Sequence, residues 1–106
     1  PGMPAYSAAK HGVLGLTKTA ALEYASSGIR VNAVCPGPVQ TPLVDNMLIA
    51  QPELADQIMQ SITQRVPAGR IGKPEEIGEA ILWLCSDASP FATGMAMPVD
   101  GGFVAQ

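Results

Sequence analysis

The sequence contains little charge: charged residues make up 14% of the chain, against 47% hydrophobic residues. Six basic and nine acidic residues give a formal net charge of -3 at pH 7. Without a basic stripe the chain has little to attract a phosphate backbone, which argues against nucleic acid as a partner. So high a share of hydrophobic residues also argues against intrinsic disorder.

Long hydrophobic runs are missing as well. The longest uninterrupted run, Ala80–Cys85, is far shorter than the roughly 20 residues that a membrane-spanning helix needs. No basic segment followed by an apolar one stands at the start, so we expect neither a secretory signal nor a membrane association. The chain opens on Pro1 and not on an initiator methionine, which predicts a processed or truncated product.

Soft metal ligands are scarce. Cys35 and Cys85 lie far apart and match no metal-binding or redox spacing. One histidine and two cysteines do not make a zinc site by themselves, so we expect no metal. The simplest expectation is a pair of buried, unpaired thiols in a protein of the reducing cytoplasm.

The first part of the chain has the pattern of a helix, from Tyr6 to about Ser26, which Gly28 is expected to end. Its surface is rich in Ala and Gly, and each helical Gly costs about 1 kcal/mol relative to Ala. Close approach of another helix or of a ligand would offset that cost. The apolar residues fall on one stripe and on a neighbouring one: Val13, Leu16, Ala20 and Tyr24, then Leu14 and Ala21.

The next segment, Ile29 to Cys35, is rich in β-branched residues and apolar on both sides of the pleat. Such a strand is typical of a parallel sheet covered by helices on both faces. It ends at "PGPVQTP", residues 36–42, where prolines remove the N–H groups that a ladder needs. Thr41 before Pro42 is a good helix start.

Residues 43–66 are weakly helical and predict two short helices on a mobile arm, divided at Pro52. A better helix begins at Pro74, with two acids beside the positive end of its dipole. A last strand lies within "GMAMPVDGG", where Asp100 is expected to form a turn. The order helix, strand, helices, strand predicts an α/β fold with two parallel strands joined by a helical crossover. The residues expected on the buried side of the Pro74 helix are Ile77, Ile81, Leu84 and Cys85, and Trp83 is expected in the core or in an interface.

Tyr6 and Lys10 lie four positions apart, so they share one face of the first helix, with Cβ atoms about 5–6 Å apart. A free phenol has a pKa near 10, and a cation within about 4–6 Å favours the phenolate. That would suit the tyrosine to general acid–base work at neutral pH. Taken alone, so short a pattern is far more typical of a surface tyrosine lying along a lysine stem, because it recurs by accident. His11 points away from this face, and we expect it to be structural or solvent-facing.

Three segments in this order resemble the C-terminal half of a short-chain dehydrogenase/reductase, essentially from end to end of the 106 residues. They are "YSAAKHGVLGLTKTAALEYASSGIRVNAVCPGPVQTP", "GRIGKPEEIGEAILWLCSD" and "TGMAMPVDGGF". The resemblance implies a fragment of a single Rossmann-type domain, with a doubly wound parallel sheet and NAD or NADP as cofactor. The implied reaction is hydride transfer between that cofactor and a carbonyl or secondary alcohol.

The resemblance also implies residue roles. Tyr6 would be the general acid/base, and Lys10 would favour its phenolate and hydrogen-bond the nicotinamide ribose. Both would therefore contact the cofactor. Pro36 and Gly37 would border the nicotinamide, Val39 would offer its backbone to the carboxamide, and the Thr41 hydroxyl would orient the same group. The arm at about 43–66 would cover a small-molecule substrate, with Leu43 and Met47 turned toward it.

The family's Gly-rich turn, its Asn-Ala-Gly motif and its catalytic serine lie upstream of the tyrosine and are not among these 106 residues. We therefore expect half an active site, inactive by itself. The resemblance further implies a homodimer or homotetramer, with the Ala- and Gly-rich helix pairing with its copy. A second interpretation stays open: a non-catalytic oligomerisation module derived from this fold.

Overall fold

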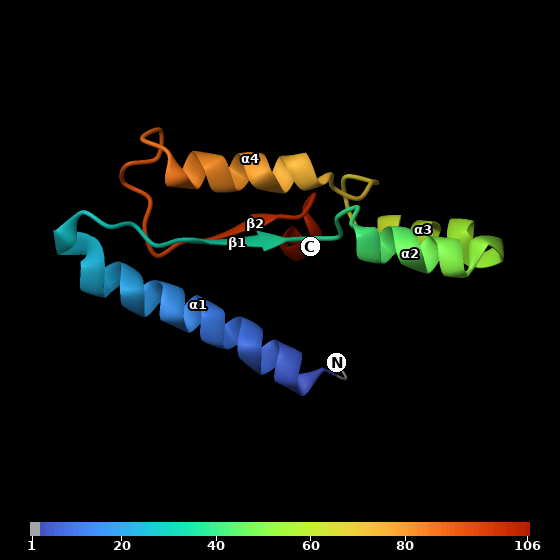
Figure 1. The fold of residues 1–106 in the computed structure, drawn as a ribbon, viewed down its shortest axis with the longest axis horizontal. Helices are drawn as coiled ribbons and strands as arrows, with labels where there is room; N and C mark the ends of the chain where they lie inside the picture. Colours follow the sequence, from blue (N-terminus) through green and yellow to red (C-terminus); the bar gives the residue numbers. More distant parts are fainter. Residues whose placement is uncertain (1–2) are drawn as a thin grey trace. The chain divides into compact units, whose positions relative to one another are not determined.

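The computed structural model describes residues 3–106. Helix and strand alternate in the order expected for an α/β fold (Figure 1). The main elements are α1 (Pro4–Tyr24), β1 (Ala33–Pro36), α2 (Pro42–Ala50), α3 (Ala55–Thr63), α4 (Pro74–Cys85) and β2 (Ala96–Val99). Three short 3-10 helices are η1 (Ala25–Ser27), η2 (Pro52–Leu54) and η3 (Phe103–Ala105). The two strands pair in parallel, since Ala33 N–H donates to Met95 O and Gly37 N–H to Val99 O.

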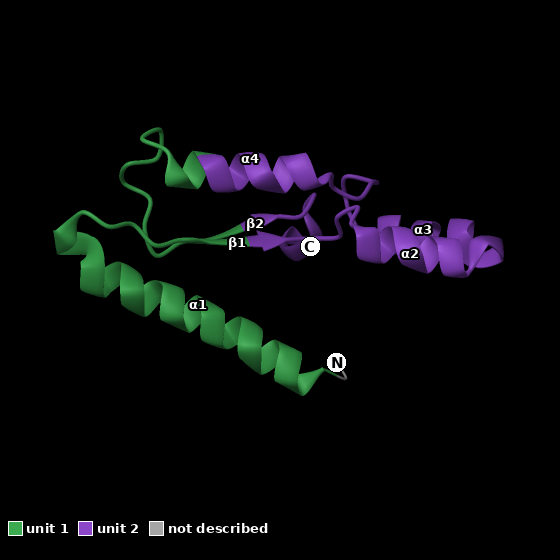
Figure 2. Ribbon diagram, in the orientation of Figure 1, with its two compact units in different colours: residues 1–34, 83–97 green, residues 35–82, 98–106 purple. Residues whose placement is uncertain are grey.

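The chain divides into two compact units (Figure 2). Unit 1 contains the described residues up to Val34 together with Trp83–Met97. Unit 2 contains Cys35–Leu82 and Pro98–Gln106. The division crosses β1, β2 and α4, so each of these elements contributes residues to both units.

In unit 1, α1 begins two residues earlier than expected, with Pro4 in its first turn. Proline lacks a backbone N–H, but an N–H in the first turn would have no partner within the helix, so nothing is lost. It ends at Tyr24 and runs into η1. Gly28 then takes the left-handed conformation, with φ 74°, and donates its N–H to Ala25 O. The predicted stop at Gly28 is therefore confirmed.

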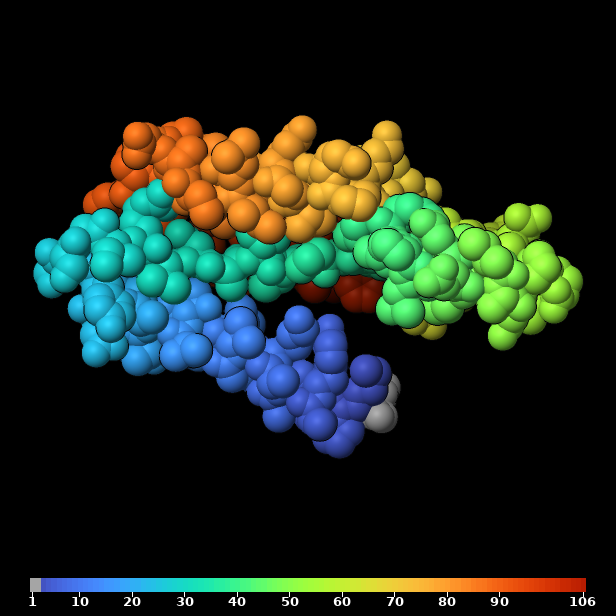
Figure 3. Space-filling model, in the orientation of Figure 1, coloured from blue at the N-terminus to red at the C-terminus, as the bar shows by residue number. Residues whose placement is uncertain are grey.

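The buried face of α1 differs from the predicted main stripe. Thr17 and Ala21 are buried, whereas Val13 and Tyr24 are exposed and Leu16 is 69% exposed. Thr17 tolerates burial because its hydroxyl donates to Val13 O at 2.8 Å. Much of the side-chain surface of α1, drawn in blue, is open in the space-filling view (Figure 3).

Gly94 is the residue at which α1 meets another segment of unit 1 closely: a Cβ built on it would lie 3.5 Å from that of Ala21. Within residues 3–106, nothing lies within 4 Å of a Cβ placed on Gly12 or Gly15. The close approach expected at these two glycines is therefore not made by the described part of this chain.

The first strand is shorter than predicted because side chains replace most of the backbone ladder before Ala33. Asn32 Oδ1 accepts from Met95 N–H at 3.0 Å, and its amide donates to Ala92 O at 2.9 Å. Val31 N–H donates to the Thr93 hydroxyl, while Val31 O accepts a backbone hydrogen bond from Gly94 N–H at 2.7 Å. Residues 29–32 therefore do not form the ladder expected there.

The strand is also less buried than predicted. All of β1 is half-buried except Pro36, its last residue, which is exposed. The expectation of burial on both faces is therefore wrong for the described chain. Arg30 anchors the approach to the strand by donating to Ser86 O at 2.9 Å and to Ala92 O at 3.0 Å.

In unit 2, α2 and α3 form the two short helices predicted for residues 43–66, with Pro52 starting η2 between them. They pack against each other (Figure 1). Thr41 caps α2: its hydroxyl oxygen accepts from Val44 N–H at 3.3 Å. The helix start expected at Thr41 and Pro42 is confirmed.

Helix α4 begins at Pro74 as predicted, but only part of its predicted buried side is covered. Leu84 is buried and Ile77 half-buried, whereas Ile81 and Cys85 are exposed. The expectation of a buried thiol is therefore wrong for Cys85, while Cys35 is half-buried. Trp83 is 43% exposed, which excludes it from the core of the described chain.

The last strand ends where the two glycines were expected to close it. Gly101 and Gly102 have φ of 63° and 94°. Asp100 forms the predicted turn, since its carboxylate accepts from Gly102 N–H at 2.9 Å and from Val104 N–H at 3.2 Å. Among residues 3–106, none of the helices is long and apolar enough to cross a membrane.

Candidate active site

Tyr6 and Lys10 lie together on α1, as predicted. The Lys10 Nζ is 5.3 Å from the centroid of the Tyr6 ring, within cation–π range. Tyr6 is 57% exposed and Lys10 is also exposed. Within residues 3–106 no group hydrogen-bonds the phenol or forms an ion pair with the ammonium. Both polar groups are therefore accessible to a ligand.

His11 stands next to this pair but does not join it. It is exposed, and its Nδ1 lies 2.8 Å from Ser7 O one turn earlier. The structure thus gives His11 the structural role on the solvent side that the helical spacing predicts.

Gly37 follows β1 in unit 2 and continues its pairing, donating its N–H to Val99 O at 3.1 Å. A Cβ at this position would lie 2.7 Å from the Cβ of Asp100, closer than real Cβ contacts. Only glycine fits here without a shift of the backbone. The path of the backbone at Pro36–Gly37 is therefore set by close packing against the end of β2.

Val39 forms an isolated parallel bridge with Gly72. The bridge is made by its neighbours: Gly72 N–H donates to Pro38 O, and Gln40 N–H donates to Gly72 O, both at 2.9 Å. The N–H and C=O of Val39 itself find no hydrogen-bond partner within residues 3–106. This arrangement suits the predicted contact of the Val39 backbone with a planar amide, which needs one donor and one acceptor.

Thr41 uses its hydroxyl oxygen as an acceptor in the cap of α2. A hydroxyl also carries one proton to donate. The cap therefore leaves Thr41 the donor that its predicted role requires. Leu43 and Met47 are exposed one turn apart on α2, the spacing that places two side chains on one face.

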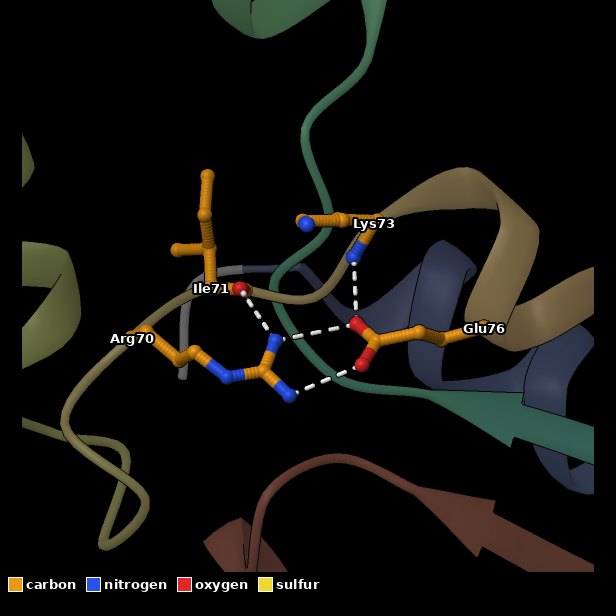
Figure 4. A network of polar contacts seen from close by, with 4 residues as sticks. All are labelled: Arg70, Ile71, Lys73 and Glu76. Atoms are coloured by element: carbon orange, nitrogen blue, oxygen red, sulfur yellow. Dashed lines mark hydrogen bonds and ion pairs between the residues drawn. The ribbon is translucent and has the colours of Figure 1, made fainter.

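The structure also contains an ion pair that we did not predict from the sequence. Arg70 and Glu76 form a bidentate pair, with Nη2–Oε1 at 2.8 Å and Nη1–Oε2 at 2.9 Å (Figure 4). Glu76 Oε2 also accepts from Lys73 N–H at 2.8 Å. Hydrogen bonds from Arg70 and then from Lys73 N–H lower the pKa of Glu76 to about 2. The same pairing raises the pKa of Arg70.

The signal for this pair was present in "RIGKPEE". A Glu two residues after a helix-starting Pro is placed to reach back to the backbone N–H that precedes the helix. An Arg three residues before that backbone N–H can then meet the same carboxylate. Within residues 3–106, no cluster of three His, Cys, Asp or Glu side chains could hold a metal ion.

The described residues therefore present two groups of predicted site residues, one in each unit. Tyr6 and Lys10 lie together in unit 1; Pro36, Gly37, Val39 and Thr41 lie together in unit 2. The helix–strand–helices–strand order and the parallel pairing are those of part of a Rossmann-like α/β protein.

The chain belongs to the short-chain dehydrogenase/reductase family. Residues 1–104 match the family model described as enoyl-(acyl carrier protein) reductase. A short-chain dehydrogenase of Pyricularia oryzae is 51% identical over 102 residues, which are 96% of this chain and 35% of that protein. The 3-oxoacyl-(acyl-carrier-protein) reductase of Thermotoga maritima is 44% identical over 104 residues, 98% of this chain and 39% of that protein.

A solved structure from Agrobacterium tumefaciens supports the same assignment. It is a putative 2-deoxy-D-gluconate 3-dehydrogenase with bound NADP, 43% identical, with a TM-score of 0.83 over 97% of this chain and 40% of that one. The chain thus spans roughly 35 to 40% of the length of these relatives. The family uses NAD or NADP as cofactor.

Proposed function

We propose that residues 1–106 are the C-terminal part of an NAD(P)-dependent oxidoreductase that interconverts a carbonyl compound and a secondary alcohol. The family and the cofactor of its relatives support this proposal. The observation that carries it is the exposed Tyr6 with the Lys10 ammonium 5.3 Å from its ring. A tyrosine–lysine pair this exposed would add little to the stability of the fold, so stability alone does not explain it.

In the proposed reaction, Tyr6 handles the proton of the substrate oxygen. In reduction, its hydroxyl donates a proton to the carbonyl oxygen; in oxidation, the phenolate takes that proton back. The bound nicotinamide supplies or accepts the hydride. Lys10 stabilises the negative charge left on the phenol oxygen, and its ammonium also has protons to donate to the ribose.

The loop of unit 2 would hold the nicotinamide side of the cofactor. Val39 offers an N–H and a C=O that are unpaired within residues 3–106, and Thr41 offers a hydroxyl proton. A carboxamide has both a donor group and an acceptor, so the three groups match its hydrogen-bonding needs. Pro36 and Gly37 would border the ring, and α2, with Leu43 and Met47, would cover the substrate.

The direct experiment uses a full-length protein that contains residues 1–106. It is titrated with NADH and with NADPH, and then assayed with acetoacetyl-CoA and a set of simple ketones. Oxidation of one of the two nucleotides, dependent on a carbonyl compound, is the expected result. A folded protein that binds neither nucleotide would contradict the proposal.

The second candidate function is a non-catalytic oligomerisation module. The exposed apolar residues of α1 and the open surface at Gly12 and Gly15 favour pairing of this helix with a copy of itself. We propose such pairing for the enzyme as well, with Trp83 and β2 in a second contact. The oxidoreductase is preferred because a scaffold alone has no use for a lysine held against an exposed tyrosine. Two free cysteines among the described residues agree with a reducing compartment such as the cytoplasm.

A further inference from the structure

The Arg70–Glu76 ion pair has no role in the reaction proposed above, yet it is bidentate and well formed. Its two side chains are 58% and 39% exposed. Ion pairs this exposed contribute little to the free energy of unfolding. What a bidentate pair does supply is geometry, because its two parallel hydrogen bonds fix one side chain in the plane of the other.

The pair fixes a turn of the backbone. Glu76 holds Lys73 N–H, and Arg70 Nη1 donates to Ile71 O at 3.2 Å as well as to Glu76 (Figure 4). The two side chains therefore bind each other, and each also binds a backbone group within residues 70–73. This turn is the segment that leads into α4.

The turn is in direct contact with the loop that carries Val39. Gly72 exchanges two backbone hydrogen bonds with that loop, one with Pro38 and one with Gln40. A Cβ built on Gly72 would lie 3.6 Å from Val39 Cγ2 and 3.7 Å from Glu76 Oε2. Gly72 is thus placed between the ion pair and Val39.

These contacts decide the direction of the Val39 peptide groups. The hydrogen bonds on either side of Val39 engage its neighbours, so the N–H and C=O of Val39 face away from Gly72. A shift of residues 70–73 would turn both groups, because the bridge is a single residue pair with no ladder to support it. The orientation of the loop that carries Val39 therefore depends on the turn at residues 70–73.

We propose that the Arg70–Glu76 ion pair is a positioning element for the cofactor, which aims the Val39 backbone at the nicotinamide by holding the turn at residues 70–73. The inference rests on the proposed function for the identity of the ligand. It assigns a part in cofactor binding to Arg70 and Glu76, which do not touch the cofactor and act on the Val39 loop through Gly72. The proposal concerns only the nicotinamide end of the cofactor.

The test compares Glu76→Gln with Glu75→Gln in the full-length protein. Both variants remove one acidic charge from the first turn of α4, but only Glu76 pairs with Arg70. Each protein is titrated with NADH or NADPH, whichever the wild type binds, and with the corresponding ADP-ribose, which lacks the nicotinamide. Amide hydrogen exchange is followed at Gln40 and Gly72, with Ala68 N–H, bonded to Gly101 O, as a reference in the same unit.

We expect Glu76→Gln to raise the Kd of the dinucleotide roughly 3- to 10-fold, since a misplaced contact group loses much of its interaction. The Kd of ADP-ribose should stay unchanged. Exchange at Gln40 and Gly72 should become roughly tenfold faster, with Ala68 unaffected, because the opening is local. Glu75→Gln should match the wild type in all three measurements. If Glu76→Gln does not fold, Arg70→Lys, which keeps the charge and loses the second hydrogen bond, takes its place with the same expectations.

Equal weakening of the dinucleotide and of ADP-ribose would overturn the inference, because it would mean general loss of structure. Faster exchange with an unchanged dinucleotide Kd would overturn it too, since the loop would then move without consequence for the cofactor. A folded wild type that binds neither nucleotide would instead contradict the proposed function, and the cofactor role of the pair with it. The exchange rates at Gln40 and Gly72 would still decide whether the pair holds the loop.

Discussion

Gly37 and Asp100 lie so close to each other at the ends of the two strands that a side chain on Gly37 would not fit. A Cβ on Gly37 would lie 2.7 Å from Asp100 Cβ and 2.8 Å from its Cα. Asp100 cannot easily retreat, because its carboxylate holds the N–H groups of Gly102 and Val104. The loop that we propose to hold the nicotinamide, residues 36–41, therefore starts from a position fixed by packing.

Replacing Gly37 with Ala should push the loop away from Asp100. We expect a loss of about 1–3 kcal/mol in the free energy of unfolding, the usual cost of overpacking. Gly78→Ala is the control: nothing lies within 4 Å of a Cβ there, and Ala stabilises a helix by about 1 kcal/mol relative to Gly. Urea unfolding of both variants measures the difference. Equal stability of the two would show that the contact with Asp100 is unimportant.

Lys10→Ala should impair the enzyme in two ways. Loss of the ammonium removes a proposed ribose contact, so the KM for the cofactor should rise. It also removes the positive charge that would stabilise the negative charge left on the Tyr6 oxygen, so kcat should fall as well. Lys18→Ala, on the same helix and also exposed, is the control. An unchanged kcat for Lys10→Ala would count against the charge-stabilising role.

The stabilising effect of Glu76, small for so exposed an ion pair, should depend on pH. Its pKa in the folded protein is about 2, below the ordinary value of 4.5, so the folded state favours the charged form. The contribution is therefore complete above pH 4.5 and is lost as the pH falls toward 2. The difference in Tm between the wild type and Glu76→Gln should be constant above that range and shrink within it. A difference that grows on acidification would have the wrong sign for this pairing.

The local signals in the sequence were the reliable ones. Gly28, Thr41 and Pro74 each set a helix end through their own backbone or side chain, and the structure confirms all three. Burial was predicted less well. Thr17 is buried and Cys85 is exposed, because burial depends on neighbours far away in the sequence.

Pairing across the chain was the hardest part to predict. The side chain of Asn32 takes over ladder positions from the backbone, which no β-propensity describes. The Tyr6–Lys10 pair was predictable because helical spacing alone brings the two together. The link from Glu76 through Gly72 to Val39 was not, because it joins segments more than thirty residues apart through a single bridge.

The 106 residues by themselves should not bind a dinucleotide. Among the described residues the buried hydrophobic side chains are only Ala21, Val66 and Leu84, and the sheet has two strands with open edges. We expect a marginally stable or self-associated protein. The family's Gly-rich turn, which would hold the pyrophosphate, is not among these residues. NADH fluorescence should show no saturable binding at micromolar concentrations; saturation there would mean that this part carries more of the site than we infer.

The most direct measurement is the rate of hydride transfer in Tyr6→Phe compared with Tyr24→Phe in the full-length enzyme. Both tyrosines are exposed on α1, but only Tyr6 has a lysine ammonium against its ring. With Tyr6 as the general acid/base, Tyr6→Phe should lower kcat by roughly 10²–10⁴ with little change in the Kd of the cofactor, and Tyr24→Phe should leave kcat within about twofold of the wild type. A Tyr6→Phe variant that keeps the parental kcat at neutral pH would contradict the account.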